Sequence, residues 1–186
     1  MPDPPRPTQS LGAEVSDFRL PLTGGGEGSL GAALGGRRGA VVLFWSGVCS
    51  HCQRYDGYLN DFAARHPELA LVVVAARQGE SRRDLECTAA ERGLRFPILC
   101  DAGLATAHAW RVEQTPRAFL VDGERRLLYR GAIDNFKYPS DPEHRPYLEA
   151  AIDDFLNHRP VARPETPSFG CAIESVYYEM PKPFGS

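Results

Sequence analysis

Two cysteines separated by two residues, in the stretch FWSGVCSHCQRY (44–55), are the residues of this sequence best suited to chemistry. Cys49 and Cys52 could hold a metal ion, form a structural disulfide or act as a redox-active dithiol. The pair follows a short apolar run (40–45) and precedes a segment with helical periodicity. It therefore lies where a buried strand is expected to end and a helix to begin.

A thiol at the start of a helix is expected to ionise easily. Unpaired backbone N–H groups and the helix dipole lower its pKa below the free value of about 8.5. We therefore predict that Cys49 is exposed and is the attacking thiolate, whereas Cys52 is more buried and resolves the mixed disulfide. His51 is predicted to stabilise the Cys49 thiolate and so to make the disulfide a stronger oxidant. A solvated His51 without influence is the alternative.

Zinc and a permanent structural disulfide are the rival interpretations of the cysteine pair. A structural zinc site usually has four ligands, and the sequence contains no second CxxC and no HxxxH. We therefore expect no metal and no cofactor other than the redox-active disulfide. Closing so short a loop adds little stability, which disfavours a purely structural disulfide.

Three further cysteines bring the total to five, so at least one thiol in the monomer stays unpaired. Cys87 and Cys100 are predicted to be inert core thiols. Cys171 is predicted to be a packed thiol, with a third redox partner for the pair as the alternative.

Strand and helix signals alternate around the pair. Strands are predicted over residues 40–45, 69–76, 95–99, 117–122 and 125–130, and helices over 55–66, 81–92, 104–110 and 147–158. Asp122-Gly123 predicts a hairpin between the last two strands. This order of βαβ units, hairpin and closing helix predicts an α/β sandwich with a mixed central β-sheet flanked by helices.

Composition narrows the possible partners. The chain has 186 residues, a formal net charge of −3 and no strong basic excess, so we expect no nucleic-acid partner. No apolar run approaches the roughly 18 residues that a membrane-spanning helix needs, so no membrane segment is expected. The N-terminus has no apolar signal-peptide region, which favours a cytoplasmic location unless the chain was trimmed.

Proline marks both ends of the chain. Residues 1–13 are predicted to be a disordered Pro-rich segment, and residues 14–158 a single compact domain. Residues 159–186 are predicted to pack on the domain or on a partner. The reason is four apolar side chains too hydrophobic to remain in water: Val176, Tyr177, Tyr178 and Met180.

Three longer stretches carry a family resemblance: FWSGVCSHC, FPILCDAGLATAHAW and VEQTPRAFLVDGERRLLYRG. With the opening FRLPL, they resemble the thioredoxin-like superfamily, and within it the redoxin and TlpA/ResA-type thiol–disulfide oxidoreductases. The resemblance covers roughly residues 14–158. It implies a thioredoxin-like three-layer sandwich that exchanges disulfides with protein thiols and disulfides, supplied by an upstream thiol reductant or oxidant.

The resemblance also implies a substrate groove. Pro116 matches the family's cis-proline, which lies against the CxxC motif. The backbone before it would then be free to pair with a substrate strand. Gln114, Thr115 and Trp45 are expected to border this groove.

Two positions depart from the family pattern. Leu43 stands where thioredoxins carry a buried aspartate, and Tyr55 stands where some ResA-type relatives carry a glutamate. Proton transfer from Cys52 is therefore expected to rely on water or on the neighbouring Asp56.

Two other functions remain as alternatives. A peroxiredoxin-like thiol peroxidase would resemble P-x-x-x-T-x-x-C, but Val42 and Ser46 stand at the proline and threonine positions before Cys49. A non-catalytic redox-sensing interaction domain is the other alternative. The C-terminal stretch PETPSFGCAIESVYYEM resembles a Pro-Thr…Gly-Cys-x-Ile tail found in some peroxiredoxin-like redoxin proteins.

Overall fold

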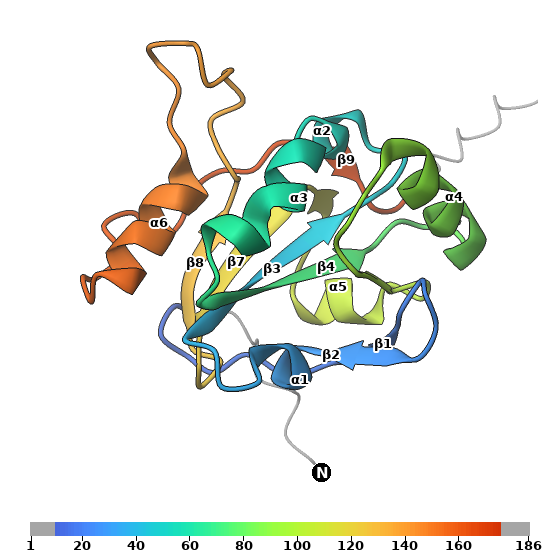
Figure 1. Cartoon of the computed structure of the whole chain (residues 1–186), viewed down its shortest axis with the longest axis horizontal. Helices are drawn as coiled ribbons and strands as arrows, with labels where there is room; N and C mark the ends of the chain where they lie inside the picture. The colour runs from blue at the N-terminus through green and yellow to red at the C-terminus, as the bar shows by residue number, and fades with distance from the viewer. Residues whose placement is uncertain (1–9, 176–186) are drawn as a thin grey trace, which may run out of the picture.

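A five-stranded mixed sheet forms the centre of the structure, a computed structural model that describes residues 10–175 (Figure 1). The strand order is β5–β4–β3–β7–β8. The strands span β3 (Gly39–Trp45), β4 (Leu69–Ala75), β5 (Ile98–Cys100), β7 (Arg117–Asp122) and β8 (Leu127–Gly131). Strands β3, β4 and β5 run parallel, whereas β7 is antiparallel to both β3 and β8. The predicted mixed sheet is confirmed.

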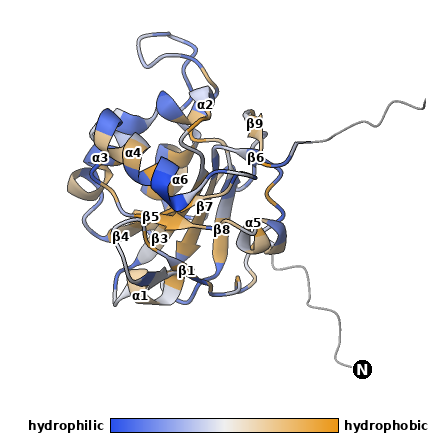
Figure 2. Cartoon of the chain, turned by 90° about the vertical axis from the view of Figure 1, so that its right-hand side faces the viewer, coloured by the Kyte–Doolittle hydropathy of each residue, from blue (hydrophilic) through white to orange (hydrophobic). Residues whose placement is uncertain are grey.

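Helices cover both faces of this sheet. They span α1 (Leu30–Leu34), α2 (Ser50–Gln53), α3 (Asp56–Arg65), α4 (Arg82–Arg92), α5 (Ala105–Ala109) and α6 (Tyr147–Leu156). One apolar core lies between the sheet and α3, α4 and α6, and includes Phe62, Leu85 and Ile152. A second core lies between the opposite face and α1 and α5, and includes Leu30 and Ala107. Figure 2 shows the apolar strands between the two helical layers, as a three-layer sandwich requires.

The strongest local signals in the sequence produced the expected elements. Every residue of β3 is buried, which explains its unbroken apolar sequence. Helix α4 begins with a complete capping box between Ser81 and Asp84. It ends at Gly93, whose φ of 63° is the left-handed conformation that glycine adopts without strain.

Several boundaries differ from the predictions, and two of these differences bear on the site or have a visible cause. The single helix expected over 55–66 is a short α2 followed by α3, so helical structure starts immediately after Cys49. The hairpin turn is longer than the Asp-Gly pair indicated. The Asp122 carboxylate accepts the backbone N–H groups of Glu124 and Arg126, and Arg125 has a φ of 62°. These contacts delay the start of β8 to Leu127.

Four short strands had no counterpart in the sequence predictions. Strands β1 (Arg19–Pro21) and β2 (Glu27–Ser29) form one antiparallel pair, and β6 (Gln114–Thr115) and β9 (Cys171–Ala172) form another. Two or three residues are too few to show a period-two pattern. The β6–β9 pair brings the C-terminal segment back against the domain, beside α2 (Figure 1).

The predictions for the two ends of the chain fall partly outside the described residues. The disordered segment was predicted over 1–13, of which 1–9 lie outside. The apolar side chains Val176, Tyr177, Tyr178 and Met180 lie outside as well. Within residues 10–175, every helix is too short or too polar to span a lipid bilayer.

Replacing Leu120 with alanine tests the position of β7 in the core. Leu120 is fully buried in the middle of this strand, so the variant should lose about 2–5 kcal/mol of unfolding free energy through lost burial and a cavity. Urea unfolding of the reduced protein, followed by circular dichroism, measures the change. Val48→Ala is the matched control, because Val48 is 65% exposed and should change stability by less than about 0.5 kcal/mol. Equal losses in the two variants would contradict this placement of β7.

Candidate active site

The cysteine pair lies at the junction of β3 and α2, as the sequence predicted. Cys49 is the residue immediately before the first turn of α2 and has an extended backbone conformation. Cys52 lies within that turn, and its N–H donates to the Cys49 carbonyl at 3.0 Å. The Cys52 side chain is completely buried. The two sulfurs therefore come from one tight turn at the edge of the core.

Two distant side chains hold the loop that leads to Cys49. The N–H of Gly47 donates to Glu80 Oε1 at 2.7 Å, and Arg92 Nη1 donates to the Gly47 carbonyl at 2.7 Å. A Cβ at Gly47 would lie 2.8 Å from Glu80 Oε1, so a larger residue there would displace the Glu80 side chain. Sequence analysis missed Glu80 and Arg92, since each lies more than thirty positions from Gly47 and carries no motif.

The structure gives Asp56 a different role from the one expected. Both of its carboxylate oxygens accept hydrogen bonds from Arg92, at 2.6 and 2.7 Å, so Asp56 positions Arg92 against the loop. The expectation that Asp56 accepts the Cys52 proton is corrected by this ion pair. Glu80 is the carboxyl group bonded to the active-site loop, and burial raises its pKa. A carboxyl group with a raised pKa is better suited to proton exchange near neutral pH.

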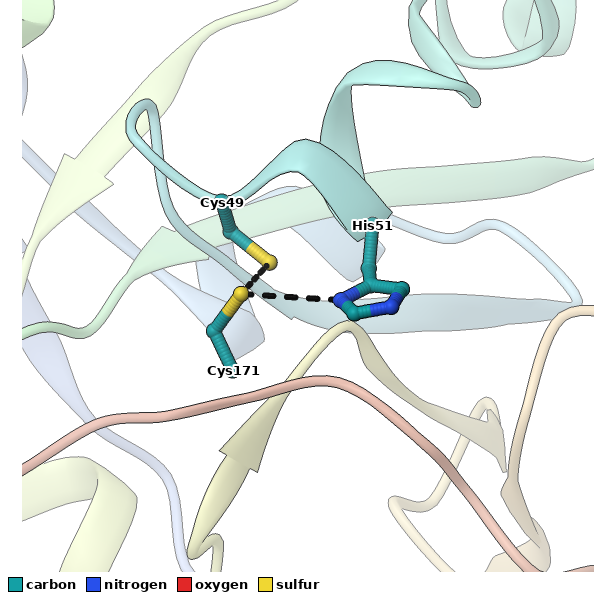
Figure 3. Close-up of side chains that lie close together, drawn as sticks. All are labelled: Cys49, His51 and Cys171. Atoms are coloured by element: carbon teal, nitrogen blue, oxygen red, sulfur yellow. Dashed lines mark hydrogen bonds between the residues drawn. The ribbon is translucent and has the colours of Figure 1, made fainter.

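Cys49 is buried, contrary to the prediction of an exposed thiol. Its side chain is 1% exposed, because the C-terminal segment lies over it. The Cys49 Sγ lies 2.8 Å from the Cys171 Sγ, and Figure 3 shows the two sulfurs facing each other. Cys49 Sγ also lies 3.3 Å from the Thr115 carbonyl oxygen. Cys49, Cys52 and Cys171 are all free thiols in this structure, so none of the three forms a disulfide.

The three thiols differ in pKa. Hydrogen bonding from the Cys52 thiol, and then from Cys171, lowers the pKa of Cys49 to about 4 despite burial. Burial, together with the neighbouring Cys49, raises the pKa of Cys52 far above its ordinary value. Burial and Cys49 also raise the pKa of Cys171. Cys49 therefore carries the thiolate, and the other two sulfurs keep their protons at neutral pH.

His51 joins this cluster on the side of Cys171. Its Nδ1 lies 3.6 Å from the Cys171 Sγ, and its ring packs edge-on against Phe136 with centroids 5.2 Å apart (Figure 3). The prediction placed His51 beside Cys49. The structure brings it near both sulfurs, and its hydrogen-bonding contact is with Cys171.

Cys49, His51 and Cys171 could also hold a metal ion. Their ligand atoms all lie within 4.8 Å of one another. Two thiolates and one imidazole are donors that suit zinc or copper(I). A structural zinc site takes four ligands, and this group provides three. The expectation of a metal-free site stays a prediction.

The backbone edge expected to bind a substrate strand lies beside the cluster. The Thr115–Pro116 peptide bond is cis, as predicted. Immediately before it, β6 pairs with β9, so that Gln114 faces Ala172 and Thr115 faces Cys171. The Gln114 side-chain amide also donates to the Ser168 carbonyl. The edge is therefore occupied by the chain's own C-terminal segment.

The structure does not place Trp45 or Cys87 where they were expected. Trp45 was predicted to border the groove, but it is completely buried against Phe96 and beneath Arg92. Trp45 therefore belongs to the apolar core and presents no surface to a groove. Cys87 was predicted to be a core thiol, but it is exposed on α4, whereas Cys100 is buried as predicted.

The AhpC/TSA family matches this sequence over residues 11–130, and the chain belongs to that family. Thiol-disulfide oxidoreductase ResA of Geobacillus kaustophilus is 29% identical over 126 residues, which cover 67% of this chain and 71% of that protein. ResA of Geobacillus thermodenitrificans matches with the same identity and coverage. The chain is thus an oxidoreductase enzyme of the thiol–disulfide type.

Solved structures of two proteins without a described function are similar over nearly the whole chain. A hypothetical protein of Sinorhizobium meliloti 1021 is 30% identical, with a TM-score of 0.78 over 89% of this chain and 94% of that one. An uncharacterized conserved protein of Geobacillus kaustophilus is 25% identical, with a TM-score of 0.78 over 90% and 93%. The fold is thioredoxin-like, as predicted.

Titration of the reduced protein should show the Cys49 thiolate directly. Thiolate absorbance near 240 nm should appear with a midpoint at about pH 4, the Cys49 pKa, and Cys49→Ser should lack this transition. Because the folded pKa lies below the unfolded one, the thiolate stabilises the reduced fold fully above the unfolded pKa. That contribution is lost as the pH falls through about 4. Cys87→Ser is the control, and a Cys49 midpoint near the free-cysteine value of about 8.5 would contradict the geometry.

Proposed function

We propose that Cys49 and Cys52 are the active site through which this enzyme exchanges disulfides with protein substrates. The observation that carries the proposal is a polypeptide segment already paired with β6, whose cysteine sulfur lies 2.8 Å from the Cys49 Sγ. An extended peptide bound by its backbone is the ligand that a free strand edge selects. The groove therefore suits a cysteine within a polypeptide better than a small isolated thiol.

The two-step exchange follows from the different pKa values of Cys49 and Cys52. The Cys49 thiolate attacks one sulfur of a substrate disulfide, and the second substrate sulfur leaves as a thiolate that takes up a proton. Cys52 then loses its proton and attacks the Cys49 sulfur, which releases the first substrate sulfur. The products are a substrate dithiol and a Cys49–Cys52 disulfide.

An upstream thiol reductant returns two electrons to the Cys49–Cys52 disulfide and completes the cycle. If an oxidant supplies the disulfide instead, the same steps run in reverse and oxidise a substrate dithiol. In either direction the electrons are held by the two sulfurs, so the reaction uses no other cofactor.

Insulin reduction by dithiothreitol tests this function. Cys49→Ser should lower the catalysed rate by about 100-fold, to the uncatalysed level, because the attacking thiolate is lost. In a Cys171→Ser background, Cys52→Ser should instead accumulate a mixed disulfide between Cys49 and insulin, since no thiol that could resolve it then faces Cys49. Each variant is also measured in a Cys171→Ser background, where no second sulfur faces Cys49. Cys87→Ser, on the exposed side of α4, is the control and should leave the rate unchanged.

A parallel assay with hydrogen peroxide separates the alternatives. Rapid Cys49-dependent peroxide consumption without insulin reduction would replace the proposed function by a thiol peroxidase. If neither insulin reduction nor peroxide consumption depends on Cys49, the chain would be a redox-sensing domain without catalytic activity.

A further inference from the structure

The C-terminal segment is fixed to the domain before it reaches the active site. Thr166 is buried, and its hydroxyl lies 2.6 Å from the Tyr129 hydroxyl and accepts the N–H of Ala132 at 3.1 Å. Its own N–H donates to the Arg130 carbonyl at 3.1 Å. A Cβ at Gly131 would lie 2.1 Å from the Thr166 hydroxyl oxygen, so glycine is needed beneath this anchor. The segment therefore approaches the groove from a defined point.

A second anchor follows the active site. Ile173 is buried in the core on the α1 and α5 side of the sheet. Its N–H donates to the Glu113 carbonyl at 3.1 Å, and its carbonyl accepts the Gln78 N–H at 2.8 Å. Arg77 binds the carbonyl of Ala172 at 3.2 Å. Cys171 is thus held from both sides, by the contacts of Thr166 and of Ile173, and these contacts fix its position relative to Cys49.

Gly170 allows the closest approach in this segment. A Cβ at this position would lie 1.8 Å from the Thr115 carbonyl oxygen, a separation that no real Cβ tolerates. The glycine lets β9 lie in register with β6 and places Cys171 opposite Thr115. The Cys171 Sγ then lies 2.8 Å from the Cys49 Sγ, within about 1 Å of disulfide bond length.

Cys49 is the central sulfur of three. Cys52 lies on its interior side and is fully buried, whereas Cys171 lies on the outer side and is partly exposed. The Cys171 sulfur is in hydrogen-bonding contact with the Cys49 sulfur, and Cys52 lies in the α2 turn that begins at Cys49. Cys49 can therefore form a disulfide with either neighbour after a small movement.

We propose that Cys171 is a third redox-active cysteine, which accepts the disulfide from Cys49–Cys52 within the same chain; this rests on the proposed function. The Cys171 thiol loses its proton, and its sulfur attacks the Cys49 Sγ. A Cys49–Cys171 bond forms and the Cys49–Cys52 bond breaks. Cys52 leaves as a thiolate and takes up a proton. One disulfide replaces another, so the step requires no external oxidant.

This step closes the groove covalently. While Cys171 is bonded to Cys49, the strand edge of β6 remains occupied, and a protein substrate cannot pair with it. Attack by Cys52 on the Cys49 sulfur reverses the step and releases Cys171. Substrate cysteines and Cys171 therefore compete for the same sulfur and the same backbone edge.

Disulfide mapping of the full-length protein tests the proposal. The protein is freed of metal with a chelator, oxidised with glutathione disulfide near neutral pH, quenched in acid, alkylated and digested without reduction for mass spectrometry. Wild type should contain both Cys49–Cys52 and Cys49–Cys171 disulfides. Cys52→Ser should contain Cys49–Cys171 in the majority of molecules, because the reverse step is blocked. Adding Cys87→Ser should leave both results unchanged.

A glycine variant tests whether docking of the segment creates this reactivity. In the Cys52→Ser background, Gly170→Ala should lower the Cys49–Cys171 fraction by about tenfold in favour of a Cys49–glutathione disulfide, because the added methyl group cannot fit beside Thr115. Gly57→Ala is the matched control. A Cβ there would meet nothing within 4 Å, so the Cys49–Cys171 fraction should stay unchanged.

The possible outcomes separate this proposal from the proposed function. Two results together would overturn the role of Cys171 and leave the proposed function intact. Wild type would contain only the Cys49–Cys52 disulfide, and in Cys52→Ser, Cys49 would be bound only to glutathione while Cys171 stays free. A wild-type Cys49 that forms no disulfide with any sulfur would overturn both. If Cys52→Ser does not fold, the wild-type map decides, and complete absence of Cys49–Cys171 would overturn the proposal.

Discussion

The antiparallel pairing of β6 with β9 is the interaction on which the rest of the site depends. It places the Cys171 backbone opposite Thr115, immediately before the cis Thr115–Pro116 bond. It also covers Cys49, which would otherwise lie at the open end of β3. Burial, sulfur–sulfur distance and proton distribution in the cluster all follow from this register. A shift of one residue would turn the Cys171 side chain away from Cys49, because successive side chains in a strand point to opposite sides.

Electrostatics then limits the cluster to a single negative charge. The thiolate on Cys49 is stabilised by hydrogen bonds from its two neighbours, and each neighbour keeps its proton partly because that charge is close. A second ionised sulfur would place two like charges in contact within a largely buried site. In the proposed exchange, a proton must therefore move together with the disulfide. Cys49 takes part in both possible disulfides because it is the sulfur between the other two.

Much of this arrangement could be predicted from sequence, and what was missed has a common physical cause. Apolar runs and helical periodicity are local signals, and they predicted the sheet and the helices. Contacts across long sequence separations carry no such signal. Glu80 reaches Gly47 across 33 positions, and Cys171 reaches Cys49 across 122. Predicting an exposed Cys49 was wrong for this reason, since nothing near Cys49 in the sequence indicates what covers it.

One signal for the covering segment was present in the sequence, in the order Gly-Cys-x-Ile. The structure gives each position a physical reason: Gly170 permits contact with the Thr115 carbonyl, Cys171 faces Cys49, and Ile173 anchors the segment in the core. A tethered segment competes for its site at an effective concentration in the millimolar range for short flexible linkers. This segment is anchored on both sides, so an incoming polypeptide must displace the strand pairing as well as the sulfur contact. Access to Cys49 is therefore set by release of β9 before any chemistry takes place.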